Sequence, residues 1–329
     1  MHRRGLLPLA TVVLLLVFAA PSAAEPWFSY VDARHGWYAG GMRGQARIWR
    51  TSDAGRTVKL LPTRFMAAGG GNAGVHFLDD KTGIWFGDFG EYGVAGSSMQ
   101  RTTDGGAHWT AVWWPSMSVA DHVAFSDSVH GWASCYIPAY PPEGGEIAKT
   151  DDGGATWATA LILVGASCGG LASPTPDSCY ATVFKSDWTW ELWRTTNGGL
   201  DWVERTLPSG VDKAPGSMAF PGVGTGWFAG AAGAIFKTTD GGRSWARQDS
   251  GTGRGLYDVE FVDVRYGWAV GQHGTILATR DGGAHWRRQR SGSTADLGCV
   301  DFVDRLHGWA GDRQVRLRTT DGGRTWHKL

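Results

Sequence analysis

The sequence predicts an all-β protein that folds as a single seven-bladed β-propeller with four antiparallel strands in each blade. The motif Thr-x-Asp-Gly-Gly-x-x-Trp, or a close variant of it, occurs seven times along the chain. A Gly-Trp step, or a variant of it, precedes each copy. Each repeat also holds four short runs of alternating apolar residues, and four strands in about 40–50 residues are the size of a propeller blade.

The motif is expected to form the turn between the third and fourth strands of each blade. Its glycines accept positive φ, and its Asp side chain can accept backbone N–H groups within the turn. Because one copy falls in every blade, these side chains cannot converge on one substrate, and we expect a structural role for them. Blade one departs from the motif, with Ala54 in place of a Gly and Val58 in place of the Trp. The central residues are Asp53, Asp104, Asp152, Asn197, Asp240, Asp281 and Asp321.

The remaining periodic positions are expected to build the core. An aromatic residue stands seven positions before the Trp of the Gly-Trp step in most repeats, as Phe261 does before Trp268. Both large rings can be buried between neighbouring sheets. The strands expected in the sixth repeat are Leu256–Val262, Trp268–Gly271, Thr275–Thr279 and Trp286–Gln289.

The first 24 residues are expected to be a signal peptide, and residues 25–329 the propeller. Arg3 and Arg4 precede an apolar stretch, and small residues at Ser22 and Ala24 suit cleavage before Glu25. The stretch is shorter than the ~20 residues that span a bilayer. We therefore expect a protein exported to a periplasmic, extracellular or lumenal compartment, without a membrane span.

Export favours disulfides, and the chain has four cysteines. Cys168 and Cys179 fall on the first two strands of the fourth repeat, across one hairpin. They are the expected pair if a disulfide forms, and the alternative is that all the thiols are free and buried. Cys135 and Cys299 lie four blades apart and are poor partners for each other.

Most histidines occupy repeat positions in turns, and His76, His122 and His273, which do not, lack metal-ligand spacing. We therefore expect neither a metal nor a cofactor. The chain also lacks the common nucleophile and phosphate-loop motifs. Binding is expected instead on the face opposite the repeat turns, where the second turns of the second and third repeats, Asp88–Ser98 and Tyr136–Glu146, are long. The aromatic residues best placed for exposure on a binding face are Trp113, Trp114, Tyr140 and Trp188.

Charge divides the ring although the whole chain is neutral, with 31 basic and 31 acidic residues. The balance argues against nucleic acid as a partner. Residues 71–200 hold 5 Lys or Arg against 14 Asp or Glu, whereas residues 237–329 hold 15 against 11. An arc of arginines suits an acidic protein partner bound by a monomeric propeller. Its members expected to reach the face opposite the repeat turns are Arg43, Arg64, Arg254, Arg288, Arg290 and Arg313.

The repeat resembles the Asp box of bacterial neuraminidase-type propellers, over residues 27–329. A single propeller of this size behind a signal segment resembles the photosystem II stability/assembly factor family. That resemblance implies a non-catalytic scaffold that holds a partner protein through arginines on one face. By position, Arg254, Arg287, Arg288 and Arg290 would fill that role.

Two other functions remain open. A sialidase-like glycoside hydrolase would need a pair of carboxylates about 5–9.5 Å apart, and Asp258, Glu260 and Asp301 on inner strands are the candidates. They can equally line the centre of the ring. A carbohydrate-binding propeller would use Trp113, Trp114 and Trp188 as stacking platforms.

Overall fold

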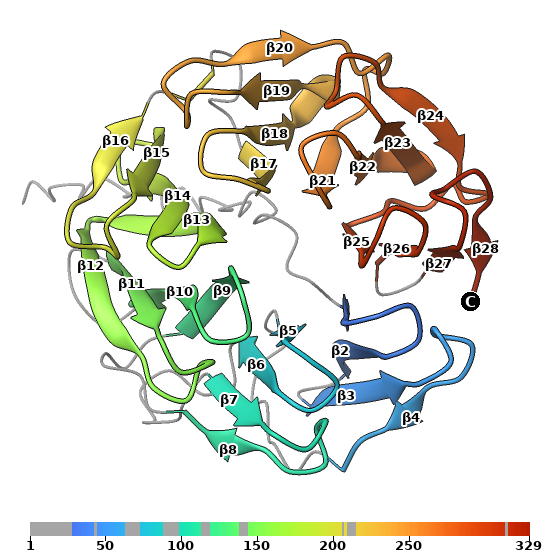
Figure 1. Ribbon diagram of the computed structural model, residues 1–329, viewed down its shortest axis with the longest axis horizontal. Helices are drawn as coiled ribbons and strands as arrows, with labels where there is room; N and C mark the ends of the chain where they lie inside the picture. The colour runs from blue at the N-terminus through green and yellow to red at the C-terminus, as the bar shows by residue number, and fades with distance from the viewer. Residues whose placement is uncertain are drawn as a thin grey trace, which may run out of the picture.

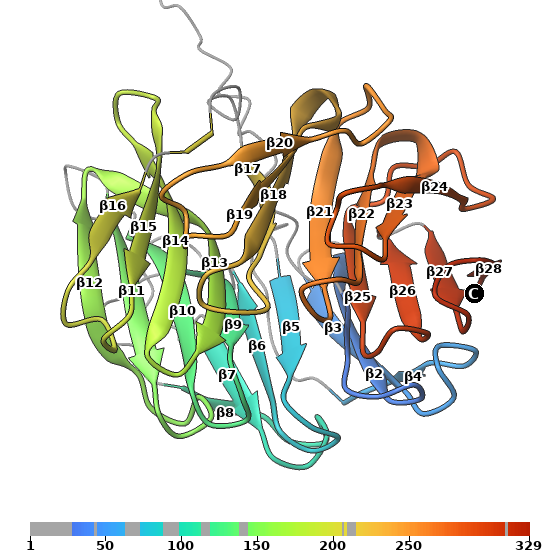
Figure 2. The same cartoon turned by 45° about the horizontal axis from the view of Figure 1, so that its top comes forward.

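The protein is a ring of seven four-stranded antiparallel sheets, seen end-on in Figure 1 and obliquely in Figure 2. In each sheet the first strand lies nearest the central axis and the fourth lies at the outer rim. The expected fold class is confirmed. The computed structural model describes residues 28–42, 45–62, 73–87, 99–112, 119–137, 144–205, 207–208, 215–312 and 315–329.

The strands of the first four blades follow one another along the chain from the axis to the rim. Blade one contains β1 (Phe28–Tyr30), β2 (Gly36–Met42), β3 (Gln45–Thr51) and β4 (Lys59–Leu60). Blade two contains β5 (Ala73–Phe77), β6 (Gly83–Gly87), β7 (Met99–Thr102) and β8 (Thr110–Ala111). Blade three contains β9 (Val119–Phe125), β10 (Gly131–Ile137), β11 (Gly144–Thr150) and β12 (Ala158–Val164). Blade four contains β13 (Ala166–Thr175), β14 (Ser178–Lys185), β15 (Trp190–Thr195) and β16 (Val203–Arg205).

Blades five to seven repeat the pattern, with single 3-10 turns after the second strands of blades five and six. Blade five contains β17 (Pro215–Ala219), β18 (Gly226–Gly230), η1 (Ala231–Gly233), β19 (Ile235–Thr238) and β20 (Ala246–Gln248). Blade six contains β21 (Leu256–Phe261), β22 (Gly267–Gly271), η2 (Gln272–Gly274), β23 (Thr275–Thr279) and β24 (Arg287–Arg290). Blade seven contains β25 (Cys299–Phe302), β26 (Gly308–Gly311), β27 (Arg316–Thr319) and β28 (His327–Lys328). The strands expected in blade six agree within one residue at each end. No helix in the described part of the chain is long and apolar enough to cross a bilayer.

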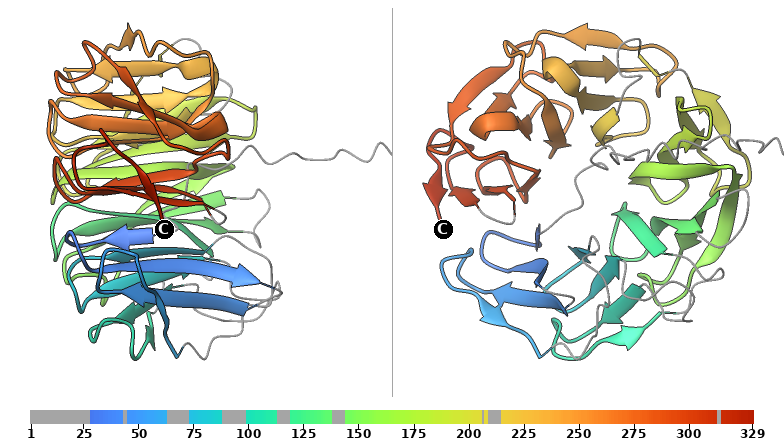
Figure 3. Two further views of the ribbon diagram at one scale, coloured as in Figure 1. Left: turned by 90° about the vertical axis from the view of Figure 1, so that its right-hand side faces the viewer. Right: turned by 180° about the vertical axis from the view of Figure 1, so that it is seen from behind.

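Among the described residues, the first and last blades exchange no strand, because β1 to β4 and β25 to β28 each form a separate four-stranded sheet. These two blades lie side by side where the ring closes (Figure 3). The Tyr30 ring stacks on Trp309 with centroids 3.4 Å apart, and the Tyr30 N–H donates to Asp301 at 2.7 Å. Closure therefore depends on side-chain packing and a few hydrogen bonds, rather than on a shared sheet.

Ring stacking between blades is a recurrent feature of the core. In five of the seven blades, the aromatic residue at the Gly-Trp position packs face to face against the inner-strand aromatic residue of the following blade. The stacked pairs are Trp37–Phe77, Tyr180–Phe220, Trp227–Phe261, Trp268–Phe302 and Trp309–Tyr30. The Trp of the repeat turn then meets the same inner ring edge-on, as Trp286 meets Phe261 at 5.9 Å. The expected burial of both periodic aromatic positions is thus explained by a ladder of rings around the disc.

The structure does not form the expected Cys168–Cys179 disulfide. All four cysteines are free and buried. The expectation placed both residues opposite each other in one hairpin, but the strand register pairs Cys168 with Val183, whereas Cys179 lies on the far side of Tyr180, which pairs with Ala172. Burial raises the pKa of the Cys168 thiol to about 11, so it stays protonated at neutral pH.

Candidate functional site

The repeat turn is a closed hydrogen-bonded unit. In blade six, the Thr279 hydroxyl donates to Asp281 at 2.9 Å and accepts the Gly283 N–H at 2.8 Å. The His285 N–H donates to the same carboxylate at 2.9 Å. Bonds from the side chain and backbone of His285 lower the pKa of Asp281 to about 2. The equivalent residues of the other blades make the same Thr-to-Asp or Thr-to-Asn bond. This geometry supports a structural role for all seven positions.

Blade four exchanges the chemical roles of two residues in this turn. Asn197 replaces the Asp, and its amide Nδ2 donates to the Asp201 carboxylate at 2.9 Å. The backbone N–H of Asp201 still donates back to the side-chain Oδ1 of Asn197 at 3.1 Å. The negative charge has therefore moved four residues along the turn, while the same ring of bonds closes.

A second set of Asp side chains closes the first turn of most blades. These residues were not among those expected from the sequence to have a role. Asp263 accepts the N–H groups of Arg265 and Tyr266 at 2.8 and 2.9 Å. The available signal was an Asp two residues after the inner-strand aromatic position. The equivalent carboxylates are Asp32, Asp79, Asp127 and Asp304.

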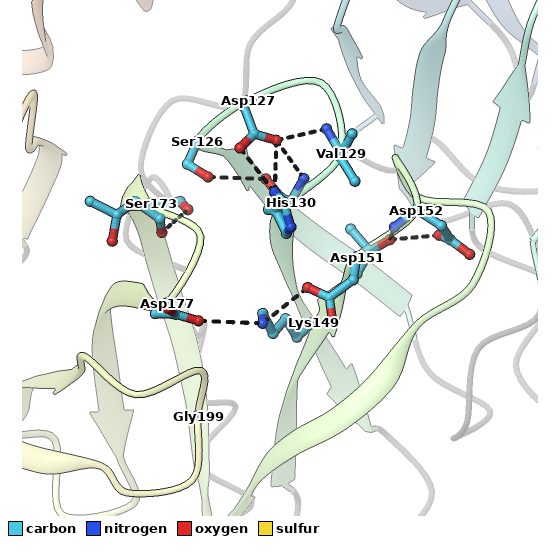
Figure 4. A network of polar contacts seen from close by, with 12 residues as sticks. Ser126, Asp127, Val129, His130, Lys149, Asp151, Asp152, Ser173, Asp177 and Gly199 are labelled. Carbon is cyan, nitrogen blue, oxygen red and sulfur yellow. Dashed lines mark hydrogen bonds and ion pairs between the residues drawn. The ribbon is translucent and has the colours of Figure 1, made fainter.

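Turn histidines lie against these carboxylates on the face that carries the repeat turns. His130 Nδ1 lies 2.9 Å from an Asp127 oxygen (Figure 4). Nearby, Lys149 lies between Asp151 at 3.0 Å and Asp177 of blade four at 3.9 Å, so it joins two blades. These polar groups are used in turns and blade contacts. Among the described residues, no three His, Cys, Asp or Glu side chains form a group that could hold a metal.

The three inner-strand carboxyls each bind the backbone of the next blade. Asp258 accepts the Val300 N–H at 2.8 Å, and Glu260 accepts the Phe302 N–H at 2.7 Å. Asp301 accepts the Tyr30 N–H across the ring closure. The structure therefore brings the three candidate carboxyls together on adjacent strands, and each one also fastens two blades.

Burial shifts the proton affinity of this inner group. It raises the pKa of Asp258 to about 6. Burial and, to a lesser extent, the charge of Asp258 raise the pKa of Asp301. The pKa of Glu260 is raised by burial and by the charges of Asp301 and Asp258. Ionising all three carboxyls at once is electrostatically costly, because like charges would lie close together away from water. Raised carboxyl pKa values also occur at catalytic sites, and the hydrolase alternative would use one of these carboxyls as its acid.

The described arginines of the expected arc gather on blade six. Arg254 lies in the link before β21, and its Nη1 donates to the His273 carbonyl at 3.1 Å and to the Thr275 hydroxyl at 3.5 Å. Arg290 pairs with Thr275 from the neighbouring strand β24. Two arginines that are 36 residues apart in the chain thus flank one threonine on the face opposite the repeat turns.

The other two described arginines lie on the outer strand. The expected outer strand, Trp286–Gln289, ended before Arg290, but β24 spans Arg287–Arg290, and all three of its arginines are exposed on the rim. Register alternation places Arg287 on the same side as Gln289, which contacts blade seven through Gly322 and Trp326. A groove of about 390 Å³ lies there, lined by Ala278, Arg280, Asp281, His285, Arg287 and Gln289. We call Arg254, Arg287, Arg288 and Arg290 the blade-six basic cluster.

Several expected binding residues lie outside the described residues: Arg43, Arg64, Arg313, Trp113, Trp114 and Tyr140. The turn Asp88–Ser98 also lies outside them. The long turn expected at Tyr136–Glu146 is shorter than expected, because strand pairing continues to Ile137 and Gly144. Trp188 is described, and 67% of its surface is exposed, which agrees with the exposure expected for it.

The fold and its turns define a class: a seven-bladed propeller whose blades each close with a Thr-Asp or Thr-Asn turn. Within that class, residues 248–329 match the model of the family described as photosynthesis system II assembly factor YCF48. The match covers the end of blade five and all of blades six and seven, so it includes the blade-six basic cluster. The resemblance to the photosystem II stability/assembly factor family is therefore confirmed.

Several solved structures share the fold. YCF48 from Cyanidioschyzon merolae is similar over 94% of this chain and 96% of its own, with 20% identity and a TM-score of 0.63. A structure of YCF48 bound to D1 peptide is similar over 91% and 94%, with 21% identity and a TM-score of 0.66. The GH74 enzyme of Niastella koreensis is also similar, at 13% identity and a TM-score of 0.55, over 93% of this chain and 65% of that enzyme. At these identities the structures establish the fold. A comparison with curated protein sequences gives no match.

Proposed function

We propose that this chain is an exported, non-catalytic propeller that binds a partner protein, in the manner of an assembly factor. The observation that carries the proposal is the blade-six basic cluster, which lies inside the part of the chain that matches the YCF48 family model. A YCF48 relative has been solved with a D1 peptide, so a protein segment is the class of ligand that we expect. Arginine pairs with carboxylates in a bidentate manner, so the partner surface is acidic.

The test reverses Arg254, Arg288 and Arg290 to Glu together and measures binding of a polyglutamate peptide at low and high salt. We expect the triple variant to lose binding, and the parent protein to lose it as salt screens the charges. The matched control reverses Arg56, Arg243 and Arg324, which are exposed in the repeat turns, and so makes the same change in net charge on the other face. Equal losses in both triple variants would show that net charge, not the basic cluster, governs binding.

Non-catalytic function has its own test, because the GH74 enzyme shares the fold. Asp258 and Asp301, the hydrolase candidates, each hold a backbone N–H of the next blade. We expect no hydrolysis of sialosides or β-glucans by the parent protein. Hydrolysis that disappears in Asp258→Asn or Asp301→Asn, while the fold remains intact by circular dichroism, would make this an enzyme.

A further inference from the structure

The outer strand of blade three differs from the other outer strands of the ring. β12 (Ala158–Val164) has seven residues with the sequence Ala-Thr-Ala-Leu-Ile-Leu-Val and carries no charge. The other outer strands have two to four residues. Most of them carry a charged side chain, and β24 carries three arginines. Short length and charge are the usual ways in which proteins prevent an edge strand from pairing with another chain, and β12 has neither.

The far half of β12 is regular and exposed. Strand pairing with β11 is unbroken from Leu161 to Val164, beyond a register shift near Ala148. Ile162 is 64% exposed and Val164 is 76% exposed. β12 is the last strand of its sheet, and no strand in the described part of the chain pairs with its outer side. Figure 1 shows it at the rim of the ring. Its outer N–H and C=O groups are therefore available to an added strand.

An exposed aromatic residue lies at the end of this edge. The residue after Val164, Gly165, accepts the Ser186 N–H at 3.2 Å, which ties the β14–β15 turn to the end of β12. Trp188 projects from that turn with a φ of 67°, a conformation that is uncommon for a large side chain. The backbone N–H of Trp188 donates to the Lys185 carbonyl at 3.0 Å, and the Trp188 ring meets the Phe184 ring edge-on at 5.7 Å between centroids. An exposed Trp is thus held in place next to the open edge.

Charge selects among the possible occupants. Residues 119–205, which form blades three and four, hold 4 Lys or Arg against 11 Asp or Glu. Asp152 lies in the turn that leads into β12, and Asp187 lies beside Trp188 at the other end. A second copy of this chain would bring two acidic surfaces together, and one pair of short strands buries less than the ~1,200–2,000 Å² of a stable dimer. A basic, extended peptide fits both the backbone edge and the charge.

We propose that the β12 edge and Trp188 form a second binding site, which takes an extended peptide segment of another protein as a fifth strand on blade three. The peptide adds to the sheet by main-chain hydrogen bonds, with apolar side chains at alternate positions against Ile162 and Val164 and a basic residue at each end. Trp188 covers the apolar side chain at one end. This site is separate from the blade-six basic cluster, and its charge preference is the opposite one.

The experiment uses a labelled seven-residue peptide in which Val and Thr alternate and Lys stands at both ends. Binding is measured by fluorescence anisotropy, and contact is located by amide hydrogen exchange. We expect protection of amides within Ala158–Val164. Ile162→Lys should weaken binding by about tenfold or more, since an added charge blocks an edge. Trp188→Ala should weaken it less, and Trp188→Phe should retain most of the affinity.

The matched control is Leu200→Lys, because Leu200 is 84% exposed, apolar and in blade four, but lies in the repeat turn. Its affinity should stay close to that of the parent protein. Equal weakening by Leu200→Lys, or equal binding of the same peptide with Glu at both ends, would overturn the site. So would peptide protection outside β12, or a dimer of the parent protein that Ile162→Lys dissociates. The arginine triple variant should bind this peptide normally, so failure here is distinguishable from failure of the proposed function.

Discussion

Blades five to seven and blades two to four follow the same plan with different fidelity. In the former, each blade keeps the stacked pair of rings, and Gln248 and Gln289 donate to the repeat turn of the following blade at Gly282 and Gly322. In blades two to four, Ile84 replaces the Gly-Trp tryptophan and Ser173 replaces the inner aromatic residue.

The comparison separates two uses of one repeat. The regular half holds the family match and the blade-six basic cluster. The less regular half carries the acidic charge, the long outer strand β12 and the exposed Trp188. Blades that keep the repeat residues use them for packing between blades. The blades that depart from the repeat carry the surface features that the other blades lack.

The largest expected effect compares one buried tryptophan from each half. Trp268 stacks on Phe302 at 3.5 Å, whereas the aromatic contact of Trp132 within the described residues is edge-on, with Trp202 at 5.7 Å. Trp268→Ala should lower the free energy of unfolding by about 3–5 kcal/mol. Trp132→Ala should cost about 1 kcal/mol less, because no stacked ring is lost. Urea denaturation measures both, and a larger loss for Trp132→Ala would break the comparison.

The next effect is a pH dependence that arises in the regular half. Burial raises the pKa of Asp258 from 3.8 to about 6, so the folded protein holds this proton more tightly than the unfolded chain. Stability must then fall as pH rises from about 4 through 6, and the raised pKa of Asp301 extends the fall to higher pH. Both side chains are half-buried, and solvent screens part of the effect. We therefore expect the free energy of unfolding to fall by about 1–2 kcal/mol over the whole range.

The control for this pH dependence is the double variant Asp258→Asn with Asp301→Asn. It cannot ionise at these positions, so thermal unfolding should show a flatter profile between pH 4 and 6 than in the parent protein. A parent profile that rises with pH over this range would contradict the shifts.

The smallest effect sharpens the comparison at the repeat turn of blade four. Asn197→Asp would place two carboxylates together, because Asn197 now donates to Asp201. We expect a loss of about 1 kcal/mol at neutral pH, recovered as acid protonates one of the pair. The reciprocal control, Asp281→Asn in blade six, keeps His285 as a neighbour and should cost less. Equal losses in chemical denaturation would show that the exchanged roles in blade four carry no energy.

Blade six shows how much could be predicted. Its four strands followed from alternation and from the repeat turn, because period-two burial and a Gly-Gly turn are local properties of the chain. The partners of its rings did not follow, since Trp268 stacks on a residue of blade seven. The Asp residues of the first turns were missed although their spacing is regular, because an Asp near a turn has many roles in a sequence.

The sequence by itself determined the number of blades, the strand order, the positions of the turns and the neutrality of the whole chain. Those features repeat, and local propensities with a period are enough to specify them. Tertiary structure decided which side chains meet. It left Cys168 opposite Val183 instead of Cys179, brought Arg254 and Arg290 to one threonine, and set Trp188 beside the end of β12. These contacts depend on strand register and on packing between blades, and a shift of one residue in register would turn Cys168 and Arg290 to the other face of their sheets.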